Sequence, residues 1–492
     1  MSDLNFLWPA EQRPRPIFGV NDIAREIVSD NCGFIEPDLL ELLESGDVNP
    51  DKKVWVVRPW LIAASLAVLA LGLSFGAVRD LNIRLAETKT QAPLVEIARP
   101  DVGTDNPESE ELLDKKDLAG LIGPRPLDLD DPRFLEISGE SGRILFAETT
   151  LDPQLQTHSL KWLKKTQAKR AALVVMNPFD GQVLALADYR RDGGETNSAL
   201  AESFPAASLF KIITAAAAVE KADLQADSEV LYDGGKHTLY KGNVIKRPDE
   251  GLHRTTLREG FAESINTVFG KLGAYTLGPD ELDNFARRFY FNQPIDFEMP
   301  VAVSNFALGN GEDLFHMAEL ASGFNRVTKT TPLHGAMLAS AVISGGILYE
   351  PTVLTEVFDR DNNVYYKSQP RSLGRVISQD TAAQLSELMQ AAVALGTGRR
   401  HFSDAEKHPL LSGLVIGGKS GTINDEEGLR VEWFVAYSYW PEPGSGAPAW
   451  PLALAAVVAN DGRAAVDSQE IIRRALLSYY QPLLDGTGRT FR

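Results

Sequence analysis

The chain has 492 residues, of which 44% are hydrophobic and 24% are charged, a composition typical of globular proteins. This composition excludes a collagen-like, wholly disordered or multi-span membrane protein, and the length allows roughly two to four domains. The formal net charge of −18 argues against a general nucleic-acid-binding protein, which needs a basic surface. The single cysteine, Cys32, excludes an intrachain disulfide and any zinc site with two or more cysteines.

An uncharged segment near the N-terminus predicts a membrane anchor. Residues 59–78 are 20 consecutive residues without a charge, long enough for a helix to span the bilayer core. Residues 1–53 carry 11 acidic and 5 basic side chains, unlike the short basic start of a cleavable signal peptide, so we expect an uncleaved anchor over 54–79. Basic residues flank the segment on both sides and do not decide its orientation. Since Cys32 precedes the segment, residues 1–53 are expected to be a short cytoplasmic segment.

The rest of the chain predicts a linker followed by one folded domain. Residues 80–143 are rich in Pro, Asp, Glu and Gly, and the part from 99 to 111 has too few apolar residues to form a core. We therefore expect a stalk or linker over 80–143 and a single folded domain over 144–492.

Within this domain, apolar runs and turn residues predict the main elements in chain order. Helices that are expected between an early and a late pair of strands indicate an α/β domain with an antiparallel sheet packed with helices. The predicted elements are strands at 171–176 and 183–187, an alanine-rich buried helix at 209–221, a hairpin from 353–358 to 364–367, strands at 433–440 and 452–460, and a closing helix at 467–484.

The first candidate for chemistry opens the alanine-rich helix. Ser208 and Lys211 are three residues apart, so their side chains share one helix face. A serine becomes a good nucleophile when a base takes its proton, and burial lowers the pKa of a lysine so that its amine can act as that base. A Ser-x-x-Lys pattern alone is weak, because an N-cap serine and a solvent-facing lysine give the same letters.

Two further short motifs follow along the chain. Ser264 and Asn266 are two residues apart and can serve one site only at a turn or a helix edge, although helix capping explains the same triplet. In the stretch Lys419-Ser420-Gly421-Thr422, a strand would project Ser420 and Thr422 to one side, where both hydroxyls can bind a substrate carboxylate. Lys419 would supply positive charge, and Gly421 would allow close approach of a substrate backbone.

Two competing motifs are present and are disfavoured by their context. Residues 413–420 match the phosphate-binding P-loop pattern, but an acidic loop with Asp425 and Glu426 follows, where a P-loop opens a helix. Residues 359–363 resemble the start of a calcium loop, but Val364 stands where that loop needs glycine. A hairpin turn is the preferred interpretation there.

Taken together, Ser-x-x-Lys, Ser-x-Asn and Lys-Ser-Gly-Thr in this order resemble the active site of penicillin-binding proteins and serine β-lactamases, a motif set that is known for that group. The surrounding sequence resembles the transpeptidase domain of penicillin-binding proteins, from about residue 144 to 492. Similar phrases include Thr331-Pro-Leu-His334, Gly396-Thr-Gly398 and Trp433-Phe-Val435.

The resemblance implies a penicillin-binding-protein/β-lactamase-like fold and a mechanism without cofactor or metal. Ser208 would attack the D-alanyl-D-alanine end of a peptidoglycan stem peptide, with Lys211 taking its proton. Ser264 would relay a proton to the leaving amine, supported by Lys419. The implied binding groups are Asn266 for the acyl chain, Ser420, Gly421 and Thr422 for the carboxylate end, and the backbone N–H groups of Ser208 and Thr422 for the oxyanion.

The same resemblance implies where the protein works and what it meets. Its expected partners are peptidoglycan stem peptides, β-lactams as covalent inhibitors, the membrane through 59–78 and other cell-wall synthesis proteins. The expected location is the inner membrane, crossed once, with the catalytic domain outside the cytoplasm. Three alternatives stay open: a D,D-carboxypeptidase or endopeptidase, a β-lactamase or β-lactam sensor, and a non-catalytic wall scaffold.

Overall fold

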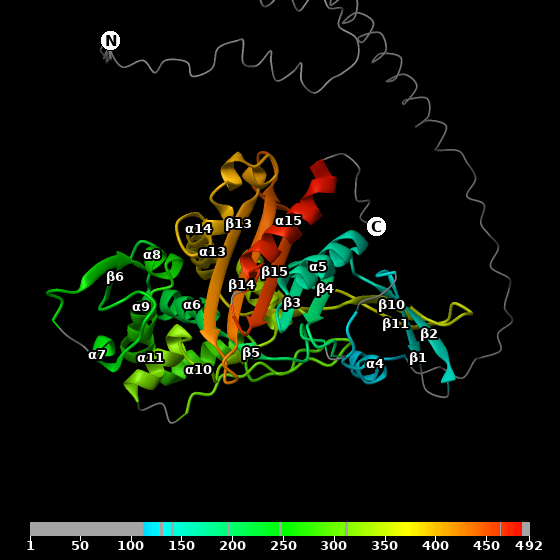
Figure 1. Ribbon diagram of the computed structural model, residues 1–492, viewed down its shortest axis with the longest axis horizontal. Coiled ribbons are helices and arrows are strands. Elements are labelled where there is room, and N and C mark those ends of the chain that lie inside the picture. Colours follow the sequence, from blue (N-terminus) through cyan, green and yellow to red (C-terminus); the bar gives the residue numbers. More distant parts are fainter. Residues whose placement is uncertain are drawn as a thin grey trace, which may run out of the picture. The chain divides into compact units, whose positions relative to one another are not determined.

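The computed structural model describes residues 112–127, 131–138, 142–194, 197–245, 248–309, 313–462 and 464–484 (Figure 1). Within these ranges no helix has the length and apolar character needed to cross a membrane. The predicted cytoplasmic segment 1–53 and the predicted anchor 54–79 lie outside the described residues.

A five-stranded antiparallel sheet forms the centre of the folded unit, with the strand order β13-β14-β15-β3-β4. Its strands are β3 (Arg170–Met176), β4 (Val183–Arg190), β13 (Val415–Asn424), β14 (Arg430–Pro441) and β15 (Pro448–Asn460). The strands predicted at 171–176, 183–187, 433–440 and 452–460 all lie within these bounds. The strands of this sheet that come first and last in the sequence, β3 and β15, therefore pair with each other in its interior.

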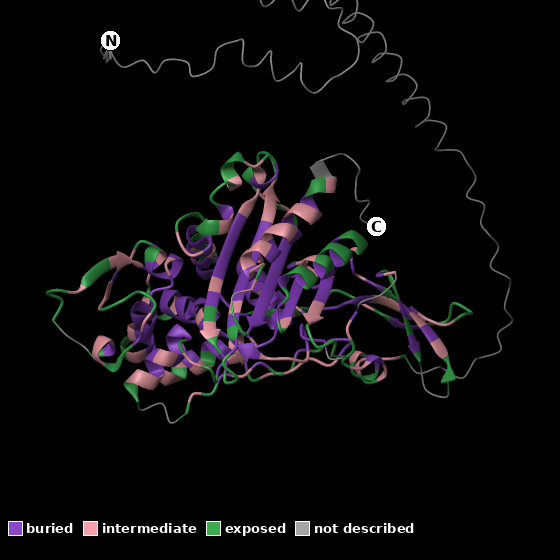
Figure 2. Cartoon of the chain, viewed as in Figure 1, coloured by how far each residue is buried: buried purple, intermediate pink, exposed green. Residues whose placement is uncertain are grey.

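Both faces of this sheet are buried, which explains why its strands are continuous apolar runs. In β15, Leu452 and Leu454 belong to one core cluster, whereas Ala453 and Ala455 belong to another on the opposite face. This alternation follows from the period of two in a strand. Figure 2 shows the buried strands at the centre of the unit, with exposed residues concentrated at the periphery.

Helices cover the two faces and give three layers. On the face with leucine, α5 (Pro153–Thr166) and α15 (Ser468–Leu484) pack on the sheet and on each other. On the other face lie α12 (Pro332–Ile343) and α13 (Gln379–Ala394), and α6 (Lys211–Ala222) packs against α13. Every residue of α6 from Lys211 to Val219 is buried, as its alanine-rich sequence predicts.

A helical lobe extends from the β13 side of the sheet (Figure 1). Its elements are β6 (Glu229–Tyr232), α7 (Lys241–Val244), β7 (His253–Thr256), α8 (Leu257–Ala262), α9 (Asn266–Lys271), the π-helical turn Leu272–Leu277, α10 (Gly278–Arg288) and α11 (Leu314–Ser322). Short elements complete the unit: β5 (Phe204–Pro205), β8 (Lys329–Thr330), β9 (Ile347–Tyr349), β12 (Ser372–Arg375), α14 (Arg399–Phe402) and 3-10 turns at Ala207–Phe210, Ala405–Lys407 and Leu411–Gly413.

A smaller four-stranded sheet lies at the other side of the central sheet, in the order β1-β2-β10-β11 (Figure 1). Its strands are β1 (Phe134–Ser138), β2 (Ile144–Thr149), β10 (Leu354–Phe358) and β11 (Val364–Lys367). The hairpin predicted between β10 and β11 is confirmed, and the carboxylate of Asp359 accepts the turn's backbone N–H groups of Asp361 and Asn363. The calcium-loop pattern is thus a hairpin turn.

The prediction of a stalk over the whole of 80–143 is wrong at its C-terminal end. Residues 115–122 form helix α4 (Lys115–Ile122), whose Leu118 is fully buried, and β1 pairs with β2. Ile137 of β1 belongs to the same large core cluster as the central sheet. The folded unit therefore includes residues before 144, because β1 pairs with β2, which in turn pairs with β10, and α4 is held through Lys115 to Glu298 and Glu350. The segment 99–111 lies outside the described residues.

Helix α4 is held to the domain by a buried charge cluster, which we call the Glu298 cluster (Lys115, Glu298, Glu350). The Lys115 ammonium lies 2.8 Å from the Glu350 carboxylate and 3.6 Å from that of Glu298. Glu298 is completely buried and also accepts hydrogen bonds from Tyr366 Oη at 2.8 Å and the Val353 N–H at 3.1 Å. Every one of these buried charges thus has an opposite charge or a donor beside it.

Candidate active site

Ser208 lies on a tight turn that leads into α6. The 3-10 turn Ala207–Phe210 continues directly into the helix, and Ser208 is half-buried whereas Leu209 and Phe210 have no exposed surface. Ala207 has a φ of +49°, a left-handed conformation that a residue with a side chain rarely adopts. The turn therefore holds the Ser208 side chain at the surface of the core, next to the start of a buried helix.

Neighbouring backbone and side chains fix this strained turn. A side chain at position 323 would place its Cβ 1.9 Å from the Ala207 carbonyl oxygen, so only glycine fits there. On the other side, the indole N–H of the buried Trp433 donates to the Pro205 carbonyl at 2.9 Å, and its ring packs edge-on against Phe204. These contacts over-determine the conformation of the turn, as strained functional turns require.

Lys211 begins α6 and is completely buried beneath Ser208. Its ammonium donates to Ser208 Oγ at 2.8 Å, to Asn266 Oδ1 at 2.8 Å and to the Ser322 carbonyl at 2.6 Å. Burial lowers the pKa of this amine well below its usual range, and the positive charge of Lys419 lowers it further. The uncharged amine is therefore easier to reach than in a solvent-exposed lysine.

Only one of the three hydrogen-bond partners of Lys211 can donate a proton to its uncharged amine. The Ser322 carbonyl only accepts, and Asn266 Oδ1 only accepts because its Nδ2 donates to the His237 carbonyl at 2.9 Å. An uncharged amine has two N–H groups and one lone pair, so the Ser208 hydroxyl is the partner that points its proton at that lone pair. The arrangement makes Lys211 a proton acceptor for Ser208.

Ser264 and Lys419 form a second hydroxyl–amine pair in the same place. Ser264 has a φ of +56° and lies in the turn between α8 and α9, and Asn266 is the first residue of α9. The triplet is therefore a turn at a helix edge, as its spacing requires. The Lys419 ammonium donates to Ser264 Oγ at 2.9 Å and to the Ser420 carbonyl at 2.9 Å, and burial lowers its pKa to about 7.

The Lys-Ser-Gly-Thr stretch lies on β13, an edge strand of the central sheet. A Cβ at Gly421 would lie 3.2 Å from the Ala207 Cβ and 3.3 Å from the Ser208 nitrogen, so the strand passes close to the Ser208 turn. The P-loop match ends in this strand and not at the start of a helix, so the disfavoured phosphate-binding interpretation has no helix N-terminus to support it.

All the residues singled out from the sequence thus surround one cleft of about 300 Å³. Ser208, Ser264, Asn266, Ser420, Gly421 and Thr422 line it. Lys211 lies beneath Ser208, and Lys419 lies beneath Ser264. The lining also contains residues without a predicted role: His237, Gly323, Phe324, Thr397 and Gln469.

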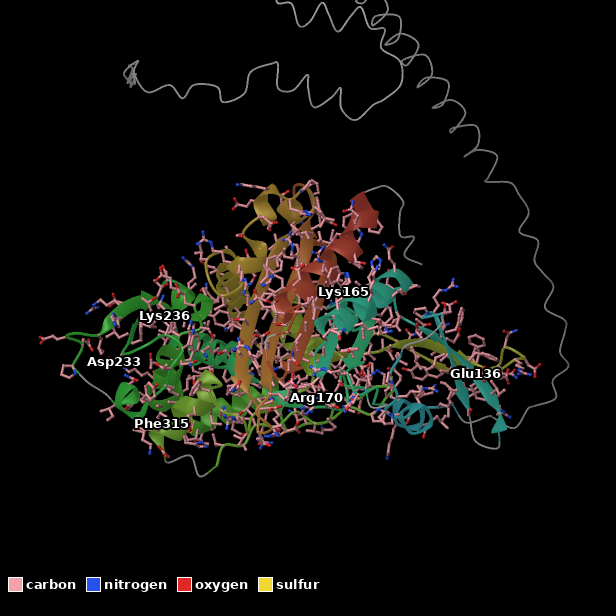
Figure 3. All side chains as sticks on the ribbon, in the orientation of Figure 1. Glu136, Lys165, Arg170, Asp233, Lys236 and Phe315 are labelled. Carbon is pink, nitrogen blue, oxygen red and sulfur yellow. The ribbon has the colours of Figure 1, made fainter. Side chains whose placement is uncertain are left out.

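These additional residues come from loops and helix ends outside the three short motifs. His237 follows Lys236, which is labelled at the edge of the helical lobe in Figure 3 and forms an ion pair with Glu263. Burial, and then the charges of Lys211 and Lys419, lower the pKa of the His237 imidazole. For Thr397 the sequence offers a signal in its two flanking glycines, since a Cβ at Gly396 would lie 2.1 Å from the Ala262 carbonyl oxygen.

Comparison with known proteins finds the same combination of fold and sequence elsewhere. The family model described as "Penicillin binding protein transpeptidase domain" matches residues 171–445. Stage V sporulation protein D of Bacillus subtilis is 30% identical over 312 residues, which are 58% of this chain and 46% of that protein. Peptidoglycan D,D-transpeptidase PbpA of Mycobacterium tuberculosis is 26% identical over 59% of this chain and 64% of its own length.

Solved structures give the same result for the fold. The imipenem acyl-enzyme complex of penicillin-binding protein A from Mycobacterium tuberculosis superposes with a TM-score of 0.54 at 25% identity, and covers 68% of this chain and 79% of that one. The D,D-transpeptidase domain of a peptidoglycan glycosyltransferase from Eggerthella lenta superposes with a TM-score of 0.55 at 23% identity, and covers 70% of this chain and 84% of that one. The chain spans about half to two-thirds of the length of the curated relatives it matches.

Proposed function

Because the chain belongs to the penicillin-binding protein transpeptidase family, we propose that it is a peptidoglycan D,D-transpeptidase that works through an acyl-enzyme at Ser208. The observation that carries the proposal is the set of partners around Lys211. When the amine of Lys211 is uncharged, the Ser208 hydroxyl is the one partner that can donate to it. The serine is therefore activated before any substrate arrives.

The proposed reaction has two halves. In the first, Ser208 Oγ attacks the carbonyl of the penultimate D-alanine and gives its proton to Lys211. The peptide bond breaks, the terminal D-alanine leaves after its amine gains a proton through Ser264, and the acyl chain stays on Ser208. In the second half, the amine of a neighbouring stem peptide attacks this ester, forms the cross-link and returns the proton to Ser208.

The remaining cleft residues support charge and orientation in these steps. The ammonium of Lys419, held against Ser264 at 2.9 Å, stabilises the negative charge that develops there. Asn266 holds both Lys211 and the His237 carbonyl, and its amide is placed to orient the acyl chain. Ser420 and Thr422, with Gly421 between them, border the end that takes the substrate carboxylate, and the backbone N–H groups of Ser208 and Thr422 are the proposed oxyanion donors.

Cross-linking is preferred over hydrolysis because a relative with 26% identity is named a D,D-transpeptidase. β-Lactams are expected to acylate Ser208 as substrate mimics, since a solved relative carries imipenem as an acyl-enzyme. Proteins that make the glycan strands bearing the stem peptides are the expected partners in cell-wall synthesis.

The test uses the full chain in detergent and a fluorescent penicillin. We expect a stable covalent band, lost in Ser208→Ala and kept in Ser412→Ala, whose serine is exposed in the 3-10 turn Leu411–Gly413. Mass spectrometry should find the adduct on the peptide that contains Ser208. A band of equal intensity in Ser208→Ala contradicts the proposal, and a band that decays within seconds indicates a β-lactamase.

A second assay separates the peptidase activities. Incubation with a stem pentapeptide donor and an amine acceptor should yield a cross-linked product and free D-alanine. Tetrapeptide and D-alanine without cross-linked product would make the protein a carboxypeptidase instead.

We also propose a membrane topology from the sequence. Residues 1–53 would be cytoplasmic, 54–79 would cross the inner membrane once, and the folded unit would lie outside the cytoplasm. The uncharged run 59–78 and the position of Cys32 before it support this arrangement. In spheroplasts, a membrane-impermeant maleimide should label Ser412→Cys but reach Cys32 only after permeabilisation. Labelling of Cys32 in intact spheroplasts contradicts the topology.

A further inference from the structure

The loop between β6 and α7 borders the cleft and carries a histidine that the proposed mechanism does not use. The backbone N–H of Asn266 donates to the Lys236 carbonyl at 2.8 Å, and its side-chain Nδ2 donates to the His237 carbonyl at 2.9 Å. Lys236, which is labelled in Figure 3, also forms an ion pair with Glu263. These two loop residues are therefore fixed to both sides of the Ser264 turn.

Packing and a local hydrogen bond hold the rest of this loop. Leu239 is buried in a small core cluster with Val244 of α7 and Ala318 of α11. Thr238 Oγ1 donates to the Gly235 carbonyl at 3.3 Å, within the same loop. A side chain on a loop that is anchored before the ligand arrives loses little entropy on binding.

The His237 imidazole is open to a ligand. His237 is exposed and lines the cleft, and among the described residues its imidazole has no hydrogen-bond partner or ion pair. An imidazole N–H donates to carboxylates, and the charged imidazole donates from both nitrogens. Because the His237 carbonyl holds the Asn266 amide, which is proposed to orient the acyl chain, His237 belongs to the acyl side of the cleft.

The charges around His237 favour an anion. Partial burial, and then the positive charges of Lys211, Lys419 and Lys236, lower the pKa of its imidazole, whereas the carboxylate of Glu263 raises it. Glu263 is itself paired with Lys236, and the described residues that line the cleft include no Asp or Glu. A ligand carboxylate would therefore meet net positive charge here, and it would in turn favour the charged imidazole.

We propose that the His237 imidazole binds a carboxylate on the acyl portion of the ligand, so that the cleft prefers anionic to neutral acyl chains, most strongly at acidic pH. This inference deepens the proposed function and rests on it. It makes His237 a residue of substrate specificity, separate from the groups that are proposed to bind the terminal carboxylate. The favoured substrates would be stem peptides whose acyl-side carboxylate is free and not amidated.

The test compares benzylpenicillin with carbenicillin, which carries one additional carboxylate on its acyl side chain. For the wild-type chain, the ratio of the second-order acylation constants, carbenicillin over benzylpenicillin, should rise roughly threefold to tenfold from about pH 8 to about pH 5.5. Over this range the histidine gains charge, whereas the carboxylates of both ligands stay ionised. The protonation of the general base affects both penicillins and cancels in the ratio.

Two variants assign the effect to His237. His237→Gln keeps a hydrogen-bond donor but cannot gain charge, so its ratio should not change with pH. His237→Lys stays charged, so its ratio should be high at both pH values. The control His253→Gln alters an exposed histidine on β7 of the same lobe and should keep the wild-type ratio and its pH dependence.

Three outcomes overturn the inference. A wild-type ratio that does not change with pH shows that His237 binds no carboxylate. A rise that persists in His237→Gln assigns the effect to another group that titrates in this range, such as Lys419, whose pKa is about 7. Equal losses on both penicillins in His237→Gln, with the wild-type ratio retained, show that the residue only supports the fold of the cleft. In all three cases the wild-type protein is still acylated, whereas wild-type protein that neither penicillin acylates refutes the proposed function itself.

Discussion

Glu298 and Lys419 are both completely buried, yet their surroundings differ in kind. The Glu298 carboxylate faces the Lys115 ammonium at 3.6 Å and accepts three hydrogen bonds, from Tyr366 Oη, the Val353 N–H and Thr352 Oγ1. Among the described residues, no ion pair within 4.0 Å includes Lys419 or its neighbour Lys211. Their amines are held by hydroxyl, amide and carbonyl oxygens instead.

This contrast separates buried charges that stabilise the fold from buried charges that serve chemistry. A buried ion with an opposite charge beside it holds elements of the fold together, and removing either partner is strongly destabilising. A buried amine without a carboxylate partner has a lowered pKa and can exchange a proton near neutral pH, at a cost to stability. The Glu298 cluster should therefore be needed for folding, and the two lysines for chemistry.

Lys211→Met should give the largest effect and the clearest separation of these roles. We expect the acylation rate constant with penicillin to fall by roughly 10²–10⁴-fold, as for loss of a general base. The thermal midpoint should stay the same or rise, because a buried amine that prefers water is removed. Lys221→Met alters a half-exposed lysine at the end of the same helix and should keep the wild-type rate. Acylation within tenfold of wild type would contradict the assigned base.

Glu298→Leu should have the opposite effect: it should lower stability and leave the acylation rate unchanged. Removing one partner of a buried charge cluster costs about 3–5 kcal/mol of unfolding free energy. The folded fraction should still be acylated at the wild-type rate. Urea unfolding measures the first effect and penicillin labelling the second. Glu356→Gln breaks a more exposed ion pair with Lys367 and should cost about 1 kcal/mol or less. Equal costs in the two variants would remove the basis of the comparison.

Deprotonation of the two lysines should change the rate of acylation in opposite directions. Lys211 must be uncharged to accept a proton, so acylation rises with pH through its lowered pKa. Lys419 must be charged to support an anionic ligand, and its pKa is about 7, so the second-order constant should decline above about pH 7. Lys419→Arg should shift that decline to higher pH. A decline at the same pH in this variant would assign it to another group.

His401 forms a partly buried ion pair, and its substitution is expected to have the smallest effect on stability. Its imidazole lies 2.9 Å from the Asp467 carboxylate and 3.5 Å from that of Glu470, and the hydrogen bond to Asp467 raises its pKa. A raised pKa in the folded state means that the pair stabilises fully below the ordinary histidine pKa. This stabilisation is lost as pH rises through the raised pKa.

His401→Gln should therefore lower the free energy of unfolding by about 1 kcal/mol at acidic pH and by less at alkaline pH. Unfolding midpoints at the two pH values measure the difference. A loss that is the same at both values would show that packing, and not the ion pair, accounts for the effect.

The sequence was most informative where signals are local. The strands β3, β4, β14 and β15 are apolar runs bounded by turns, and their pairing follows from ordinary antiparallel topology. Ser208 and Lys211 are near neighbours on the chain, so spacing alone brings them together. Helix α15 begins at Ser468, within one residue of its predicted start.

The sequence was least informative where tertiary packing decides whether an element forms or where a side chain lies. Helix α4 has eight residues and β1 has five. Helix α4 is held by the distant Glu298 and Glu350, and β1 joins a sheet whose next strand after β2 is the distant β10. Composition alone made this region resemble a linker. Thr397 and Gln469 likewise enter the cleft from separate elements, 72 residues apart, and no short motif contains both.

The contact between Trp433 and the Ser208 turn has an optical consequence. The buried indole donates its N–H to Pro205, three residues before Ser208, so its fluorescence depends on the position of that carbonyl. Acylation that displaces the turn should shift the emission of Trp433, and Trp433→Phe should remove this part of the signal. The protein thus carries an intrinsic fluorophore beside its proposed nucleophile, and the lifetime of the acyl-enzyme can be followed by stopped-flow without any label.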